Sequence, residues 1–314
     1  MSIMEIAVLG AGAMGSLFGG CLAKAGHAVT LIDINQPHLE AIHAKGLRLE
    51  MDGDTRAIRN INAIRPEATD KSPDLLLVFT KSMHTRAALS GIEHLLGETT
   101  AVLTLQNGLG NVEAIRDFVP LSNVLVGVTT WPADLVGPGS VSSHGEGKIR
   151  MMSADGERTS KVSAVAEALN SAGLNCQVDD DVWEAIWEKV AFNAALNSIC
   201  AVTGTTVDQL ALLDDSKNLA LAVAAEVISV ANAAGVCADL SVCSANIVHA
   251  IEQHRGHKPS MLQDVLAGRK TEIEGINGAV VDVARKLNVS VPHTETLAKL
   301  VKLIDARNAS AVAE

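Results

Sequence analysis

The sequence begins with glycines whose spacing is typical of phosphate binding. Gly10, Gly12 and Gly15, with Ala13 and Met14 between the last two, form a G-x-G-x-x-G motif between a predicted strand and a predicted helix. The first glycine permits a tight turn, the second lets a pyrophosphate approach the backbone, and the third lets helix and strand pack closely. The helix N-terminus adds amide donors for the pyrophosphate. The motif predicts a dinucleotide site; the alternative is a glycine-rich connection that only packs.

A carboxylate at the end of the next predicted strand strengthens this interpretation. Asp33 directly follows the apolar run 28–32, where a carboxylate accepts hydrogen bonds from the ribose hydroxyls of a dinucleotide. It would repel a 2′-phosphate, and residues 34–36 include no arginine. We therefore expect NAD(P)H as cofactor, with NADH favoured. Lys81, after the apolar run 75–79, either reaches an adenosine phosphate or is a solvated loop lysine.

A second group of polar residues lies on one predicted helix. Lys189, Asn193 and Asn197 are spaced four apart, so their side chains line one side of a helix that is otherwise almost wholly apolar. Burying an ammonium and two amides without partners is costly, so this stripe should face a polar cavity or a polar partner. The alternative is the exposed face of a surface helix, which would leave Trp183 and Trp187 too narrow a wall to pack on.

The order of predicted elements indicates two domains of different class. Apolar runs at 6–9, 28–32, 75–79, 101–105 and 124–128 read as buried strands that alternate with helices. The sequence predicts a hairpin at Asp52-Gly53 and an antiparallel closing edge within 137–150. From residue 181 onward only helices are indicated, at roughly 182–200, 206–234, 240–255 and 270–287. We predict an α/β Rossmann-type doubly wound sheet in a dinucleotide-binding domain (1–180), followed by a separate all-α domain (181–314).

Composition excludes several other classes. Of the 314 residues, 36 are acidic and 25 basic, a net charge of −11 that is the wrong sign for nucleic acid. The five cysteines are scattered without a C-x-x-C pair, which argues against a disulfide framework or a zinc site. The uncharged run 6–23 contains five glycines and lacks the flanks of a signal or membrane segment. We expect a cytoplasmic protein with no membrane partner, and the apolar stretch 206–234 makes a homodimer through the helical domain reasonable.

Polar residues near the C-terminus complete a larger pattern. Ser260 and Glu272 alone are ordinary, as a helix cap and a first-turn residue. Together with the glycine motif, Asn107-Gly108, and the run Trp187–Asn197, the segments Ser260–Asp264 and Glu272–Gly278 resemble the ketopantoate reductase (2-dehydropantoate 2-reductase) family over nearly the whole length. The resemblance implies NAD(P)H-dependent reduction of 2-dehydropantoate, a small 2-keto acid, to pantoate, in pantothenate biosynthesis.

The same resemblance assigns roles to individual residues. It implies that Lys189 is the general acid, and that Glu272 contacts the substrate hydroxyl or orients the lysine. It further implies that Ser260 binds the substrate carboxylate. Three asparagines are implied to line the substrate site, of which the first also adjoins the cofactor: Asn107, Asn193 and Asn197.

Two departures from the family pattern keep alternatives open. The family usually prefers NADPH and often has an arginine just past the second strand, whereas this chain has Asp33 and uncharged neighbours. Well-known members carry a substrate-binding asparagine where this chain has His257. These favour, as an alternative, an NADH-linked D-2-hydroxy acid dehydrogenase acting on branched or aromatic 2-keto acids. A non-catalytic dinucleotide sensor is a remote alternative, because fold alone does not imply chemistry.

Overall fold

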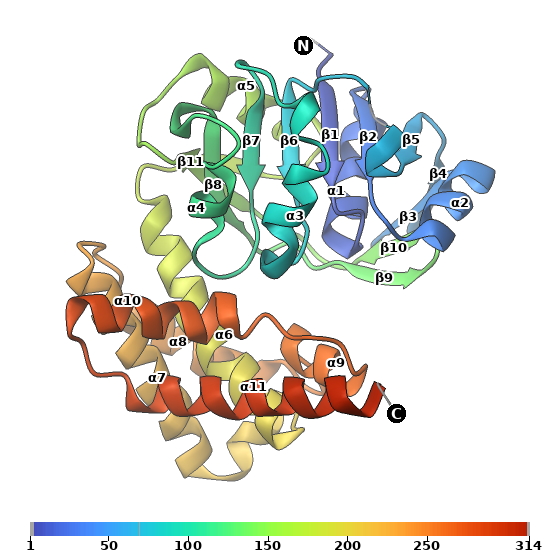
Figure 1. The fold of residues 1–314 in the computed structure, drawn as a ribbon. Helices are drawn as coiled ribbons and strands as arrows, with labels where there is room; N and C mark the ends of the chain where they lie inside the picture. The colour runs from blue at the N-terminus through green and yellow to red at the C-terminus, as the bar shows by residue number, and fades with distance from the viewer. Residues whose placement is uncertain (1–2, 69, 313–314) are drawn as a thin grey trace. The chain divides into compact units, whose positions relative to one another are not determined.

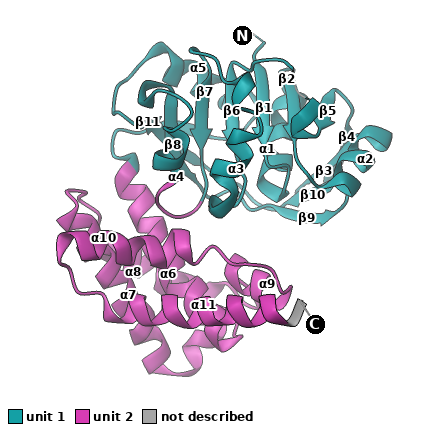
Figure 2. Ribbon diagram, viewed as in Figure 1, with its two compact units in different colours: residues 1–106, 111–182 teal, residues 107–110, 183–314 magenta. Residues whose placement is uncertain are grey.

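The computed structural model describes residues 3–68 and 70–312, and the chain forms two compact units (Figure 2). Unit 1 comprises residues 1–106 and 111–182, and unit 2 comprises residues 107–110 and 183–314. Four residues that follow a strand of unit 1 thus belong to the helical unit. That 1–180 and 181–314 are separate folding domains stays a prediction.

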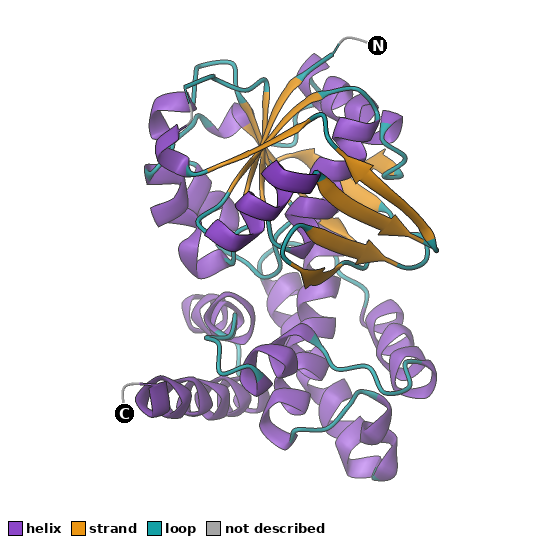
Figure 3. Ribbon diagram, turned by 90° about the vertical axis from the view of Figure 1, so that its right-hand side faces the viewer, coloured by secondary structure: helices purple, strands orange, loops and turns teal. Residues whose placement is uncertain are grey.

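Unit 1 is built around a mostly parallel sheet with helices on both faces (Figure 3). Its strands are β1 (Glu5–Leu9), β2 (Ala28–Ile32), β5 (Ile61–Ile64), β6 (Leu75–Val78), β7 (Ala101–Thr104), β8 (Val124–Thr129), β11 (Ile149–Ser153) and β12 (Cys176–Val178). Within the described residues their order is β12-β11-β8-β7-β6-β1-β2-β5, and only the β8–β11 pair is antiparallel. The order from β5 to β8 is that of a dinucleotide-binding doubly wound sheet. The predicted fold class is confirmed.

A smaller sheet accounts for the remaining strands. These are β3 (Leu47–Met51), β4 (Asp54–Ile58), β9 (Asp134–Gly137) and β10 (Ser140–Ser143), in the order β4-β3-β10-β9. The predicted hairpin joins β3 to β4, with φ of +48° at Asp52 and +87° at Gly53. The predicted closing edge is divided, because β10 pairs with β3 while β11 pairs with β8 of the main sheet. Short alternating runs do not specify which of two sheets a strand joins, since long-range partners decide it.

The helices of unit 1 connect the strands (Figure 1). They are α1 (Ala13–Lys24), α2 (Gln36–Lys45), α3 (Thr85–Ser90), α4 (Asn111–Ile115) and α5 (Ser160–Ser171). α1 contains three glycines, at positions 15, 19 and 20, and a side chain at Gly19 would lie 2.5 Å from Leu31. These small residues let α1 pack closely on the sheet and thereby fix the turn that precedes it.

Within the described residues, the regular elements of unit 2 are all helical, and loops, including 107–110, connect them or join unit 1. Its elements are α6 (Val182–Thr203, whose first residue belongs to unit 1), the 3₁₀ turn η5 (Asp208–Leu212), α7 (Asp214–Ala233), α8 (Leu240–Gln253), α9 (Ser260–Leu266), the π-helical turn η6 (Glu274–Gly278), α10 (Ala279–Leu287) and α11 (Pro292–Val312). α6 is buried along most of its length, as its apolar sequence predicts. In the part of the chain that the structure describes, no helix is both long and apolar enough to cross a membrane.

Candidate active site

Each of the three glycines in the turn between β1 and α1 lies in a different environment. Gly10 has φ of +94°, and a Cβ there would lie 2.7 Å from the backbone nitrogen of Thr80. A Cβ at Gly15 would lie 1.9 Å from the carbonyl oxygen of Gly10, so only glycine lets α1 begin this close to the turn. Gly12 is exposed, and a Cβ there would meet nothing within 4 Å. Two positions are therefore closed by packing, and the middle one is open to a ligand.

The first turn of α1 presents backbone N–H groups that have no acceptor within the helix. Gly12 is the N-cap residue and supplies no side-chain cap, while Ala13 and Met14, in the first turn, are half-buried. The first amides of any helix lack intrahelical acceptors, and the helix dipole adds partial positive charge there. An anionic phosphate is the ligand that such a turn binds best.

Asp33 lies at the end of β2 beside this turn. Its Oδ2 accepts a hydrogen bond from Ala11 N at 2.6 Å, and its Oδ1 accepts one from Asn35 N at 2.8 Å. These two bonds orient the half-buried carboxylate while leaving lone pairs for further donors. Nearby, Arg65 donates to the carbonyl oxygen of Ile34 at 3.3 Å and pairs with Glu67.

Lys81 lies after β6, at the same edge of the sheet as the glycine turn. It is half-buried. Sequence reasoning missed a neighbour, Gln106, whose amide donates to the carbonyl oxygen of Thr80 at 2.5 Å and to Thr85 Oγ1 at 2.9 Å. Gln106 thereby fixes the segment that packs on Gly10. No local motif marks such a glutamine, because its partners lie 21 and 26 residues away.

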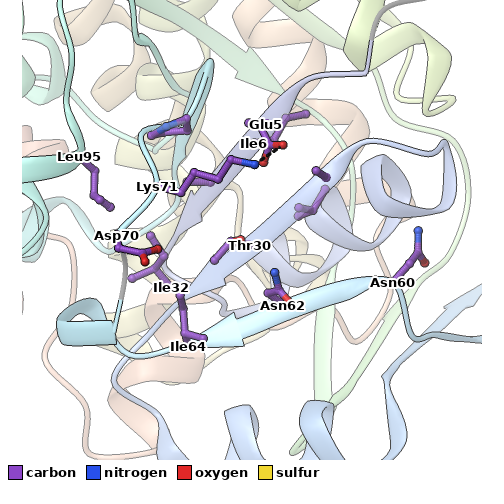
Figure 4. Close-up of a pocket in the computed structure, with 14 residues that line it drawn as sticks. Glu5, Ile6, Thr30, Ile32, Asn60, Asn62, Ile64, Asp70, Lys71 and Leu95 are labelled. Carbon is purple, nitrogen blue, oxygen red and sulfur yellow. Dashed lines mark ion pairs between the residues drawn. The ribbon is translucent and has the colours of Figure 1, made fainter.

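A separate groove of about 380 Å³ opens on unit 1 near β1, β2 and β5 (Figure 4). Its polar lining includes Asn60 and Asn62, and an ion pair joins Lys71 Nζ to Glu5 Oε1 at 2.5 Å. None of the residues that line it belongs to the glycine turn, and Asp33 is not among them. This groove is therefore distinct from the candidate dinucleotide site.

In unit 2, α6 carries the three polar residues predicted to form a stripe. Asn193 and Asn197 are 9% and 5% exposed, and within the described residues neither side-chain amide has a hydrogen-bond partner. Their residues are largely buried, but the amide atoms themselves are not cut off from solvent, so a ligand or water can satisfy them. The alternative of an exposed helix face does not fit these two positions.

Lys189, one turn before Asn193, is perturbed by its surroundings. Burial lowers the pKa of its ammonium from the ordinary value of 10.5 to about 8, and the charge of Glu272 acts in the opposite direction. Desolvation disfavours a cation, whereas a nearby carboxylate favours it, so the two effects compete. A lysine pKa close to neutrality is the property that an acid–base catalyst needs.

Glu272 is half-buried in an irregular segment rather than in the helix predicted for 270–287. Before it, Asp305 of α11 accepts hydrogen bonds from Thr271, at 2.8 Å from Oγ1 and 3.2 Å from N. After it comes η6, a π-helical turn, and α10 begins only at Ala279. π-helical turns insert an extra residue into a helix and are frequent at functional sites.

Asn107 belongs to unit 2 because its loop is joined to this turn. Leu109 N donates to the carbonyl oxygen of Gly275 at 2.8 Å, and a Cβ at Gly108 would lie 2.2 Å from the same oxygen. Gly108 also has φ of +86°, so both space and backbone conformation require glycine. The predicted pair Asn107-Gly108 is thus anchored next to the segment of Glu272.

Ser260 and His257 lie at the start of α9 and in the loop before it. Both are exposed. Ser260 follows Pro259, and the carbonyl oxygen of His257 accepts from Val207 N at 3.0 Å. The His257 ring meets that of His254 edge-to-face, with centroids 5.9 Å apart. Assignment of the substrate carboxylate to Ser260 stays a prediction.

Comparison with known proteins identifies the family of this chain. The family model described as ketopantoate reductase PanE/ApbA matches residues 6–156, and that of its C-terminal part matches residues 181–305. The chain belongs to the ketopantoate reductase family. A 2-dehydropantoate 2-reductase of Streptococcus pyogenes is 33% identical over 96% of this chain and 98% of its own, and one of Halobacterium salinarum is 35% identical over 96% and 98%.

Two solved structures superpose closely on the chain. A ternary structure of D-mandelate dehydrogenase with NADH and anilino(oxo)acetate has a TM-score of 0.91 at 30% identity, covering 98% of this chain and 100% of its own. A PanE/ApbA family ketopantoate reductase from Ralstonia eutropha has a TM-score of 0.90 at 31% identity, over 98% and 100%. The protein is an oxidoreductase that acts on a CH–OH group with a nicotinamide dinucleotide. The open space at Gly12 and the orientation of Asp33 fit that cofactor.

Proposed function

We propose that this ketopantoate reductase family member reduces 2-dehydropantoate to pantoate, with Lys189 as the general acid. The observation that carries the proposal is the Lys189 ammonium, with a pKa of about 8, on the same helix as the side chains of Asn193 and Asn197, which are largely buried but whose amide atoms a ligand can still reach. A developing alkoxide requires a proton donor of this kind. The names of the curated relatives support the substrate.

Unit 1 supplies the residues that would hold the cofactor. The pyrophosphate would bind the amides of the turn that contains Gly10, Gly12 and Gly15 and continues through Ala13 and Met14. Asp33 would accept from the adenosine ribose, and Lys81 would lie toward the adenosine phosphate. The bound dihydronicotinamide supplies the hydride for the substrate C2 carbonyl.

Unit 2 supplies the proton and binds the keto acid. The Lys189 ammonium polarises the keto oxygen and then donates a proton as charge develops on it, a role typically worth about 10² to 10⁴ in rate. At neutral pH most of the lysine is protonated, since its pKa is about 8. Glu272 keeps that proton available and accepts from the substrate hydroxyl. Four further side chains would bind the substrate: Asn107, Asn193, Asn197 and, at its carboxylate, Ser260.

NADH is proposed as the preferred cofactor. The Asp33 carboxylate is held in place by two backbone amides, so it cannot easily turn away from a 2′-phosphate. The guanidinium of Arg65, which donates to the carbonyl oxygen of Ile34, is paired with Glu67 and so offers little free positive charge. Arg65 therefore does not offset the repulsion of a 2′-phosphate by Asp33.

A second candidate function is an NADH-linked D-2-hydroxy acid dehydrogenase for branched or aromatic 2-keto acids. It is favoured by Asp33, by His257 in place of the family's asparagine, and by the likeness to D-mandelate dehydrogenase with NADH. Steady-state assays of ketopantoate against a panel of 2-keto acids, each with both cofactors, separate the two. Greater kcat/KM for an aromatic 2-keto acid than for ketopantoate would select the second candidate.

The role of Lys189 is tested by single-turnover reduction in Lys189→Ala. We expect a loss of about 10² to 10⁴ in the rate of hydride transfer, with cofactor binding retained. A near-native rate would reject Lys189 as the acid. Lys286, a last-turn residue of α10, offers a matched control, since Lys286→Ala should leave the rate unchanged.

A further inference from the structure

The π-helical turn η6 is fastened to α6 by one buried side chain. Asn277 is fully buried, and its Nδ2 donates to the carbonyl oxygen of Ala194 at 3.1 Å and to Ser198 Oγ at 3.4 Å. Ser198 Oγ itself donates to the carbonyl oxygen of Ala194 at 2.5 Å. On α6 these acceptors directly follow Asn193 and Asn197. Asn277 is thus hydrogen-bonded to α6 next to Asn193 and Asn197, the two residues proposed to bind substrate.

The other end of this connection is the backbone of Glu272. Its carbonyl oxygen accepts from Gly275 N at 3.0 Å and from Ile276 N at 3.1 Å. Gly278 N donates to the carbonyl oxygen of Ile273 at 2.9 Å, the i to i−5 bond of the π turn. The turn is therefore a rigid link of a few residues between Asn277 and Glu272. A displacement at Asn277 would pass to the carboxylate.

An apolar residue would suit this buried place better on packing grounds alone. Leucine has the same branched arrangement of side-chain heavy atoms as asparagine, although its two methyl groups make it larger, and it brings no polar atoms that must be satisfied. In the described structure Asn277 Oδ1 has no protein partner, so the amide is held through its Nδ2 alone. The two hydrogen bonds from Nδ2 define one orientation of η6 on α6. Apolar contacts, which are not directional, would not define a single orientation.

We propose that Asn277 is a positioning residue, which holds the Glu272 carboxylate beside the Lys189 ammonium by pinning η6 to α6. This inference rests on the proposed function, because it assigns a purpose to the proximity of those two charges. Glu272 supports the charged form of Lys189 only while it stays close, since the interaction falls with distance. If η6 moves away from α6, the Glu272 charge raises the pKa of Lys189 less, and the lowering of that pKa by burial is opposed less.

The test is Asn277→Leu in the full-length protein. We expect kcat at pH 7 to fall about 10- to 100-fold, the cost of a misplacement of about 1 Å. The alkaline limb of the pH profile should move to lower pH, and KM for NADH should stay within about twofold. The pKa of Lys189 can also be measured without turnover, by pH titration of its 15Nζ NMR signal, which is assigned by its loss in Lys189→Arg. This measurement needs no substrate, so it tests the positioning role even if the proposed substrate is wrong.

Two further variants keep the outcome decisive. Asn123→Leu is the matched control, because Asn123 is also buried and donates to a backbone carbonyl, that of Glu98 at 2.7 Å, but lies in unit 1. It should lower stability without moving the Lys189 titration. Ser198→Ala removes only the second acceptor, and we expect a smaller shift in the same direction. The proposal is overturned if the pKa of Lys189 is unchanged in Asn277→Leu. If Asn277→Leu does not fold, an unchanged Lys189 pKa in Ser198→Ala overturns it instead.

Discussion

The two candidate sites differ in what recognises the ligand. In unit 1 the glycine turn works through backbone amides and through the absence of side chains, as the 1.9 Å approach at Gly15 shows. In unit 2 the candidate ligand-binding groups are side chains from α6, from the segment before η6 and from the loop of Asn107. Their charges and amides must be oriented by the surrounding structure. A backbone site tolerates little change in shape, whereas a side-chain site depends on perturbed electrostatics.

The largest expected effect is on folding, at Gly15. Gly15→Ala places a methyl group 1.9 Å from the Gly10 carbonyl oxygen, so backbone must shift, at a cost of about 3 kcal/mol. Gly12→Ala adds the same methyl group in open space and should fold normally while raising KM for the cofactor. Urea unfolding and cofactor titration of both variants measure the contrast. Equal stability of the two variants would contradict the close packing of Gly15 against Gly10.

The same contrast explains how much could be predicted from sequence. The glycine turn and Asp33 lie within one strand–helix–strand unit, so local spacing was sufficient to place them together. The Lys189 stripe is visible as a helical period, but only the family resemblance implies its relation to Glu272, because the π turn on which that relation depends is marked by no propensity. Asn277 and Gln106 have partners far away in the chain, so only the fold identifies them.

The charge of Glu272 should appear in the pH profile. In the proposed mechanism the reduction requires protonated Lys189, so we expect kcat to decline as pH rises through about 8. Glu272→Gln removes the interaction that raises this pKa, and the decline should then begin at lower pH, with kcat at pH 7 about tenfold lower. Steady-state rates from pH 6 to 10 measure both. An alkaline limb that stays at the wild-type pH would separate Glu272 from the lysine.

Cofactor choice should respond to one charge in unit 1. Asp33→Asn keeps the size of the side chain and an oxygen acceptor but removes the repulsion of a 2′-phosphate, which at roughly 6 Å is worth about 1 to 3 kcal/mol. The ratio of kcat/KM for NADPH over NADH should rise about tenfold or more. Arg65→Ala is the companion variant, and it should change the ratio little because Glu67 already pairs with Arg65. An unchanged ratio in Asp33→Asn would count against the ribose assignment.

The last expected effect is a gain in stability when the Lys189 charge is removed. The pKa of Lys189 is lower in the folded protein than its ordinary value, so between about pH 8 and 10.5 the unfolded chain binds more protons and stability rises with pH. Below pH 8 the buried ammonium must be kept charged, and Lys189→Met removes that cost while retaining the apolar stem. We expect a modestly higher Tm at pH 7 that converges on the wild-type value toward pH 10. A lower Tm at every pH would mean that Lys189 is held by favourable pairing rather than strained by burial, and the two sites would then differ less than the pKa indicates.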